Sequence, residues 1–233
     1  MARKRNQLRP VKIQRRFPSA APGSVMIAAG NTRILCTASI SDEPPRWLRD
    51  ADPPRGWVTA EYNMMPGSTP DRQRRGPNSR ATEIQRLIGR SLRAAVDLNK
   101  MPGIAVTCDC DVICADGGTR TAAITGAFVA LSDAIAAARR DGRITRNPIL
   151  GPLAAVSVGI IDGKAVLDLD YQLDVRAEVD MNVAMNHRGQ FIEVQGTGEA
   201  GTFTREQLDD MLDLATRGIR QLIREQRKAL KRR

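Results

Sequence analysis

Residues 104–140 read IAVTCDCDVICADGGTRTAAITGAFVALSDAIAAARR, and this stretch decides the fold. Apolar and polar residues alternate from Ile104 to Cys114, a period that predicts a β-strand. Residues 122–140 are apolar on nearly every face, which predicts a buried helix. Between them lies Asp116-Gly-Gly-Thr-Arg120. Two adjacent glycines allow backbone conformations that other residues avoid, so we expect a tight strand-to-helix turn here.

The same turn, residues 116–120, is a candidate anion site. Consecutive backbone N–H groups and the partial positive charge of a helix N-terminus favour bound phosphate. Thr119 adds a hydroxyl group and Arg120 adds a permanent cation. On the residues alone, an ordinary glycine turn without bound anion is an equally good interpretation.

Strand and helix patterns recur on both sides of this stretch. The first part of the chain predicts a hairpin around Gly30, a strand at 57–62 and a helix at 80–97. Segment 66–79 between them predicts a mobile, positively charged loop. The last part predicts strands at 154–161, 164–171, 180–186 and 190–195, then a helix that begins with a capping box at 204–207. We therefore expect an α+β fold in which residues 1–233 form one domain of two similar halves, about 1–140 and 154–233.

Three of the four cysteines lie close together, with the spacing C-x-C-x₃-C at Cys108, Cys110 and Cys114. This spacing lacks a fourth metal ligand, and the only histidine, His187, lies far along the chain. The cysteines also alternate within an apolar strand pattern. They are therefore predicted to be small buried residues rather than zinc ligands. His187 is predicted to lie at the surface, in a turn.

A formal net charge of +10 and a pI of about 10.2 indicate a polyanionic partner. Basic residues gather in residues 1–16, in 72–75 and at the chain end, although the two terminal groups are equally typical of solvated tails. Aromatic residues are only 3% of the chain, so a nucleic acid would be bound through its phosphates rather than by base stacking. No uninterrupted apolar run approaches the ~18–20 residues of a membrane span, and we expect a cytoplasmic protein.

A group of acidic residues in the second half is a candidate metal site. Alternation in 164–171 predicts that Asp168 and Asp170 face solvent. Asp174 and Asp180 would lie ~20 Å apart along one straight strand, so they can share an ion only if the chain bends between them. Two carboxylates with water and substrate oxygens are typical of Mg²⁺ sites. On residue pattern alone, however, a solvated acidic edge is favoured over a metal site.

Six segments together resemble the bacterial ribonuclease PH family. They are WVTAEY (57–62), EIQRLIGRSLR (83–93), DCDV (109–112), ADGGTRT (115–121), DMNV (180–183) and IEVQGT (192–197). The resemblance extends in order from about Asn6 to the last helix. It implies a ribosomal protein S5 domain 2-like fold and a homohexamer built as a trimer of dimers. It also implies phosphorolysis of transfer RNA 3′ ends, in which inorganic phosphate attacks the terminal phosphodiester and releases a nucleoside diphosphate.

The resemblance also assigns roles to particular residues. It implies that Asp174 and Asp180 bind Mg²⁺ and transfer protons. It implies phosphate binding by Arg80, Gly118, Thr119 and Arg120, and RNA contact by Arg72 and Arg75. The sequence departs from the family pattern at Gly67, where arginine is usual, and the loop that leads to Arg80 is several residues short. Leu173 also replaces a common acidic residue.

Two other functions remain open on the sequence. Relatives in exosome-type complexes include ring subunits that bind RNA without catalysis, and these tend to lose the phosphate-site arginine or the acidic pair. Both are present here, which favours an enzyme. The third possibility is a hydrolytic, metal-only nuclease, which would act without phosphate and release nucleoside monophosphates.

Overall fold

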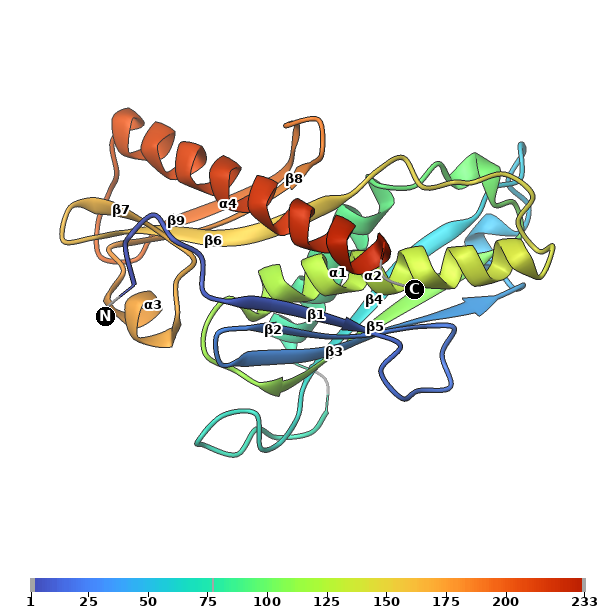
Figure 1. The fold of residues 1–233 in the computed structure, drawn as a ribbon, viewed down its shortest axis with the longest axis horizontal. Coiled ribbons are helices and arrows are strands. Elements are labelled where there is room, and N and C mark those ends of the chain that lie inside the picture. The colour runs from blue at the N-terminus through green and yellow to red at the C-terminus, as the bar shows by residue number, and fades with distance from the viewer. Residues whose placement is uncertain (1–2, 77, 232–233) are drawn as a thin grey trace.

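The computed structural model describes residues 3–76 and 78–231, in which two sheet-plus-helix halves pack against each other (Figure 1). The first half contains a five-stranded sheet of order β1-β2-β3-β5-β4. Only β4 and β5 pair in parallel; the other neighbours are antiparallel. The strands are β1 (Val11–Arg15), β2 (Gly23–Ala29), β3 (Thr32–Ser41), β4 (Trp57–Met64) and β5 (Ala105–Cys114).

Two helices cover this sheet, α1 (Ser79–Arg93) and α2 (Thr119–Arg140). The N-cap of α1 is Asn78, whose side chain accepts a hydrogen bond from the Ala81 backbone N–H. The helix buries a stripe that includes Ile84 and Leu92. Helix α2 is buried along most of its length, as its sequence predicted. Two 3₁₀ turns, η1 (Arg46–Leu48) and η2 (Leu98–Lys100), lie in the connecting loops.

The second half contains a four-stranded antiparallel sheet of order β7-β6-β8-β9. Its helix α4 begins at the predicted capping box: the Thr204 and Gln207 backbone N–H groups each donate to the other residue's side chain, at 2.9 and 3.2 Å. The elements are β6 (Leu153–Ile161), β7 (Lys164–Leu167), α3 (Tyr171–Arg176), β8 (Val179–Asn186), β9 (Phe191–Gly198) and α4 (Arg205–Lys231).

Helix α2 joins the two halves. It contacts β2 and β3 on one side and β6 and α4 on the other, and Figure 1 shows it between them. Among the described residues, α2 alone is long and apolar enough to cross a membrane by length and composition, contrary to the expectation that no segment would be. However, 83% of its most apolar stretch is buried inside the protein, which is typical of a core helix. The α2 N-terminus is thereby fixed between the halves.

The predicted strand at 164–171 is wrong in its second part. Strand β7 ends at Leu167, and Asp168 takes a left-handed conformation with φ 60°. The Asp168 side chain is buried, and Asp170 is the N-cap of α3, where its carboxylate accepts a hydrogen bond from the Leu173 N–H. The alternating pattern continued past Leu167, but a buried ion pair to Arg9 turns Asp168 inward.

The basic N-terminal segment is also more ordered than a solvated tail. Residues 11–15 form the edge strand β1, which the sequence analysis did not predict. Arg9 is only 6% exposed, and Arg15 forms an ion pair with Asp133 at 2.6 Å. Of the basic chain end, Arg232 and Arg233 lie outside the described residues.

Cys108 and Cys110 are buried in β5, as their alternation predicted. Burial raises the pKa of the Cys108 thiol well above its ordinary value, so the neutral form, a weak metal ligand, is favoured. Cys114, at the end of the strand, is partly exposed. His187 does lie between β8 and β9 in a turn, but it is half-buried, with its ring against Gly151.

Candidate active site

An open cleft of about 1270 Å³ is lined by both halves of the molecule. The first half contributes the end of β4, the loop before α1, the beginning of α1 and turn 116–120. The second half contributes α3 and β8. Every site residue expected from the sequence lines this cleft: Arg72, Arg75, Arg80, Gly118, Thr119, Arg120, Asp174 and Asp180.

Turn 116–120, hereafter the phosphate turn, requires both of its glycines. Gly117 and Gly118 have φ values of 73° and 65°, which residues with a side chain rarely adopt. A Cβ atom on Gly117 would also lie 2.6 Å from the Leu169 carbonyl oxygen. Within the described part of the chain, the backbone N–H groups of residues 117–120 have no hydrogen-bond acceptor. The phosphate turn therefore offers a row of unpaired donors at the start of α2.

Two guanidinium groups from the first half line the cleft. Arg80 is an exposed residue in the first turn of α1. Arg120 lies in the first turn of α2, and its Nη1 is 3.6 Å from Oε1 of Glu83. Burial raises the pKa of Asp174 above its ordinary value, and the charges of Arg80 and Arg120 oppose part of this shift. Cations from the first half therefore act on a carboxylate from the second.

Tyr62, which was not expected to be a site residue, supports the phosphate turn. Its hydroxyl donates a hydrogen bond to Oγ1 of Thr119 at 2.8 Å. Tyr62 is 2% exposed, and burial raises the pKa of its phenol, so the donor keeps its proton at neutral pH. Because Thr119 accepts this bond, its own hydroxyl proton is available to another acceptor. Tyr62 ends the quoted segment 57–62, but only the fold shows that it reaches Thr119.

The chain bend that Asp174 and Asp180 needed is supplied by α3. The helix reverses the path after β7, so both residues line the cleft. The pKa of Asp180 is raised to about 6, first by burial and then by the negative charge of Asp174, while Arg120 opposes the shift. Glu199, a second residue not singled out from the sequence, raises the pKa of both aspartates.

The acidic pair fits a hard divalent cation. Oδ1 of Asp180 is buried and has no hydrogen-bond partner among the described residues, while Oδ2 is 3.5 Å from the Asn182 side-chain amide. A buried, unpaired carboxylate oxygen is unfavourable unless a proton or a cation binds it. In the described ranges, no group of three or more His, Cys, Asp or Glu side chains could hold a metal ion. The remaining ligands would therefore come from water or substrate, as is common for Mg²⁺.

The mouth of the cleft is basic. Arg72, Arg74 and Arg75 are exposed on the loop between β4 and α1, and all three line the cleft. Figure 1 shows this loop extending from the body of the molecule. Their charge at the entrance would attract the phosphates of a single strand whose end enters the cleft.

Two family models match the chain. Residues 7–136 match domain 1 of the 3′ exoribonuclease family, and residues 151–218 match domain 2. The chain is 54% identical over 233 residues to ribonuclease PH of Corynebacterium efficiens, covering 98% of this chain and 94% of the relative. It is 53% identical to ribonuclease PH of Corynebacterium glutamicum, with the same two coverages.

Solved structures share the fold at lower sequence identity. One is the Archaeoglobus fulgidus exosome with RNA bound to the active site, with a TM-score of 0.83 and 21% identity over 96% of this chain and 90% of that chain. Another is Rrp46 of rice (Oryza sativa), with a TM-score of 0.81 and 18% identity over 99% and 98%. These likenesses extend over both halves and show that the fold, including the join between the halves, is shared.

Proposed function

This chain belongs to the ribonuclease PH family of 3′ exoribonucleases, and from this premise we propose a mechanism and a substrate for its cleft. The chain is a phosphate-dependent 3′-to-5′ exoribonuclease. One observation carries the assignment of the site. The phosphate turn, Arg80 and Arg120 of the first half, together called the anion cradle, line the same cleft as two carboxylates of the second half.

The cradle answers the main electrostatic difficulty of phosphorolysis. Inorganic phosphate and the RNA phosphodiester are both anions, so their approach is unfavourable in water. The unpaired N–H groups of the phosphate turn, together with Arg80 and Arg120, offset this repulsion and orient the attacking oxygen. The Thr119 hydroxyl adds one more donor. No nucleophilic side chain is needed, because phosphate itself forms the new bond to the terminal phosphorus.

Asp174 and Asp180, contributed by the second half, would hold Mg²⁺ in the same cleft. When bound, the ion would supply positive charge beside the scissile phosphodiester. Without metal, the pKa of about 6 lets Asp180 hold a proton close to neutral pH. A bound Mg²⁺ would lower this pKa, so the value applies only to the metal-free site.

Transfer RNA precursors with short 3′ extensions are the proposed substrates. The basic mouth at Arg72 and Arg75 would hold the strand that leads into the cleft, and released products would be nucleoside diphosphates. We also propose that the chain works in the cytoplasm as a homohexamer. The fold it shares with exosome structures supports a multimeric ring, and light scattering coupled to size-exclusion chromatography would measure its mass.

One assay tests the proposal against its alternatives. The protein is incubated with Mg²⁺ and a transfer RNA that carries a short 3′ extension, with and without inorganic phosphate. We expect shortening only with phosphate, and nucleoside diphosphates as products. Equal trimming without phosphate, with monophosphates released, would indicate a hydrolytic nuclease. Binding of RNA without trimming under either condition would indicate a non-catalytic ring subunit.

A further inference from the structure

A buried ion pair lies directly beneath the phosphate turn. The Arg9 and Asp168 side chains are 7% and 9% exposed, and Nη2 of Arg9 lies 2.7 Å from Oδ1 of Asp168. The Arg9 Nε and backbone N–H both donate to Oδ2 of Asp168, at 3.1 and 2.7 Å. Two hydrogen bonds from the guanidinium, within a full charge pair, therefore fix it in one orientation, and the backbone bond holds the same carboxylate.

The remaining donors of Arg9 reach the backbone of the phosphate turn. Nη1 donates to the Asp116 carbonyl oxygen at 2.5 Å, and Nη2 approaches the Gly117 carbonyl oxygen at 3.4 Å. Thr32 adds two bonds: its Oγ1 donates to the Gly117 carbonyl oxygen at 2.8 Å and accepts from the Asp116 N–H at 3.0 Å. A Cβ atom on Gly118 would lie 2.9 Å from Arg9 Nη2, so the turn rests against the guanidinium.

These bonds control the direction of the unpaired N–H groups. A trans peptide is planar, with its C=O and N–H pointing in opposite directions. Holding the Asp116 carbonyl therefore fixes the Gly117 N–H, and holding the Gly117 carbonyl fixes the Gly118 N–H. Both N–H groups then point away from Arg9. Without these bonds, two residues of positive φ could rotate at little steric cost, because glycine has no side chain.

We propose that Arg9 is a positioning residue for the attacking phosphate, kept in place by Asp168 and assisted by Thr32. Arg9 acts through the phosphate turn and does not touch phosphate itself. Asp168 neutralises its charge, so its contribution is orientation rather than attraction. This inference rests on the proposed phosphorolytic function and extends the phosphate site to a residue of the N-terminal segment.

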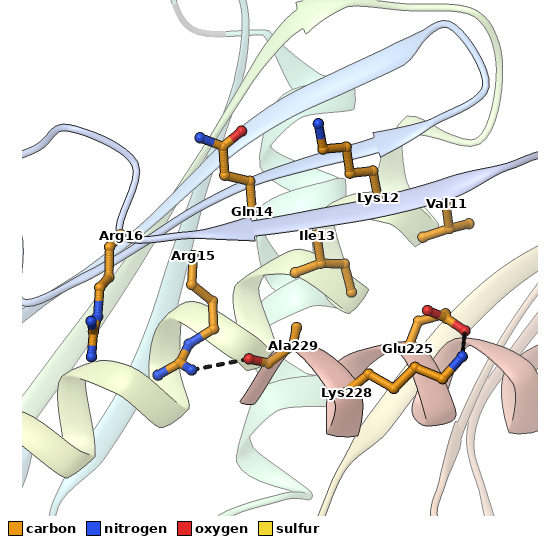
Figure 2. A pocket seen from close by; sticks show the side chains of 9 residues that line it. All are labelled: Val11, Lys12, Ile13, Gln14, Arg15, Arg16, Glu225, Lys228 and Ala229. Carbon is orange, nitrogen blue, oxygen red and sulfur yellow. Dashed lines mark hydrogen bonds and ion pairs between the residues drawn. The ribbon is translucent and has the colours of Figure 1, made fainter. Parts of the chain in front are cut away.

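The chain offers a matched control at the other end of β1. Arg15 forms a comparable pair with Asp133, with side chains 17% and 13% exposed, and also donates to two backbone carbonyl oxygens, of Ala229 and Leu230, at 3.0 and 3.1 Å. Figure 2 shows Arg15 reaching Ala229 beside a separate groove between β1 and α4. Asp133 lies in the second half of α2, well away from the phosphate turn at its start.

The test compares Arg9→Lys with Arg15→Lys. Lysine keeps the charge for the aspartate, but one ammonium group cannot also hold two carbonyl oxygens as a guanidinium fork does. We expect Arg9→Lys to raise the KM for inorganic phosphate about tenfold, the size of one charge-assisted hydrogen bond. The KM for RNA should stay within about twofold of wild type by the same measure. Arg15→Lys should leave both constants unchanged, even if it lowers the melting temperature equally.

Thr32→Val tests the same device without disturbing the ion pair. Valine preserves the shape of this fully buried residue but removes both of its bonds to the turn. A raised phosphate KM in this variant supports the inference even if Arg9→Lys does not fold. A wild-type phosphate KM in Thr32→Val and in folded Arg9→Lys overturns it, as does an equal rise in Arg15→Lys. If the wild-type protein trims RNA equally well without phosphate, the proposed function fails first and this inference fails with it.

Discussion

The two halves of the molecule share an architecture and contribute opposite charges to one cleft. The first half places Arg80 and Arg120 in the first turns of α1 and α2, next to unpaired N–H groups. The second half places Asp174 and Asp180 on α3 and at the start of β8. A helix N-terminus stabilises anions, whereas two neighbouring carboxylates stabilise cations or protons. Neither half alone provides both, so the reaction requires the join between them.

Asp180→Asn removes the contribution of the second half and should have the largest effect. The neutral amide can neither hold a cation strongly nor release a proton, so we expect kcat to fall by about 1000-fold. Steady-state phosphorolysis measures the fall, and a shift of the melting temperature by Mg²⁺ reports metal binding separately. Asp209→Asn on the exposed face of α4 is the matched control. A variant that kept both wild-type activity and the Mg²⁺ shift would show that the carboxylate pair is not the metal site.

Arg120→Ala removes a cation of the first half. We expect kcat/KM for phosphate to fall by about 100-fold, since one charge-assisted donor to the attacking anion is lost. RNA affinity, measured by filter binding or fluorescence anisotropy, should change little. Arg139→Ala, at the exposed far end of α2, should behave as wild type. A collapse of RNA binding instead would mean that Arg120 holds the RNA rather than the phosphate.

The pH dependence of stability tests the acidic half by itself, because the charged form of Asp180 destabilises the metal-free protein. The pKa of Asp180 is about 6 in the folded state. In the unfolded chain it returns to about 4, so between these values the folded state holds the proton that the unfolded state has lost. The free energy of unfolding contributed by this group therefore falls as pH rises through that window, by roughly 1–3 kcal/mol.

Urea unfolding of wild type and Asp180→Asn in EDTA, from pH 4 to pH 7, measures this effect. The variant should become the more stable protein as pH rises, although it is the less active one. A stability difference that stays constant across the window would contradict the raised pKa.

Tyr62→Phe gives the smallest expected effect and tests how the first half orients the Thr119 hydroxyl. The phenyl ring preserves the packing of a fully buried side chain, but the bond to Thr119 is lost. We expect the phosphate KM to rise about three- to tenfold, because the threonine hydroxyl is no longer held in one orientation. Adding Tyr62→Phe to Thr119→Val should have no further effect. Additive effects of the two substitutions would show that Tyr62 acts independently of Thr119.

The sequence predicted best where one pattern controls one element. The strand, turn and helix of residues 104–140 were predicted correctly because a period of two, a glycine pair and an apolar segment each permit one local structure. The prediction was wrong at Asp168, where alternation continued but a partner 159 residues away turned the side chain inward. The edge strand β1 was missed because its five residues are mostly polar, and an edge strand needs few buried side chains.

The site was predictable residue by residue, but its supports were not. Arg80, the phosphate turn and the acidic pair lie in or near short segments that resemble a known family. Arg9, Thr32 and Tyr62 act through contacts that only the folded chain creates. Arg9 was grouped with the terminal basic residues on composition, since its neighbours along the chain do not indicate that it pairs with Asp168, which lies between β7 and α3.

The contact between Arg9 and Asp168 also sets an order of events during synthesis. Arg3 donates to the Leu167 and Asp168 carbonyl oxygens, and the Arg5 carbonyl accepts from the Leu167 N–H. Arg3, Arg5 and Arg9 therefore have partners among residues that are synthesised much later. Closing so long a loop is entropically unfavourable until the second half can fold. A nascent chain that stops before residue 168 thus lacks the Arg9–Asp168 pair beside the phosphate turn, and we expect phosphate to bind only after residue 168 has been made.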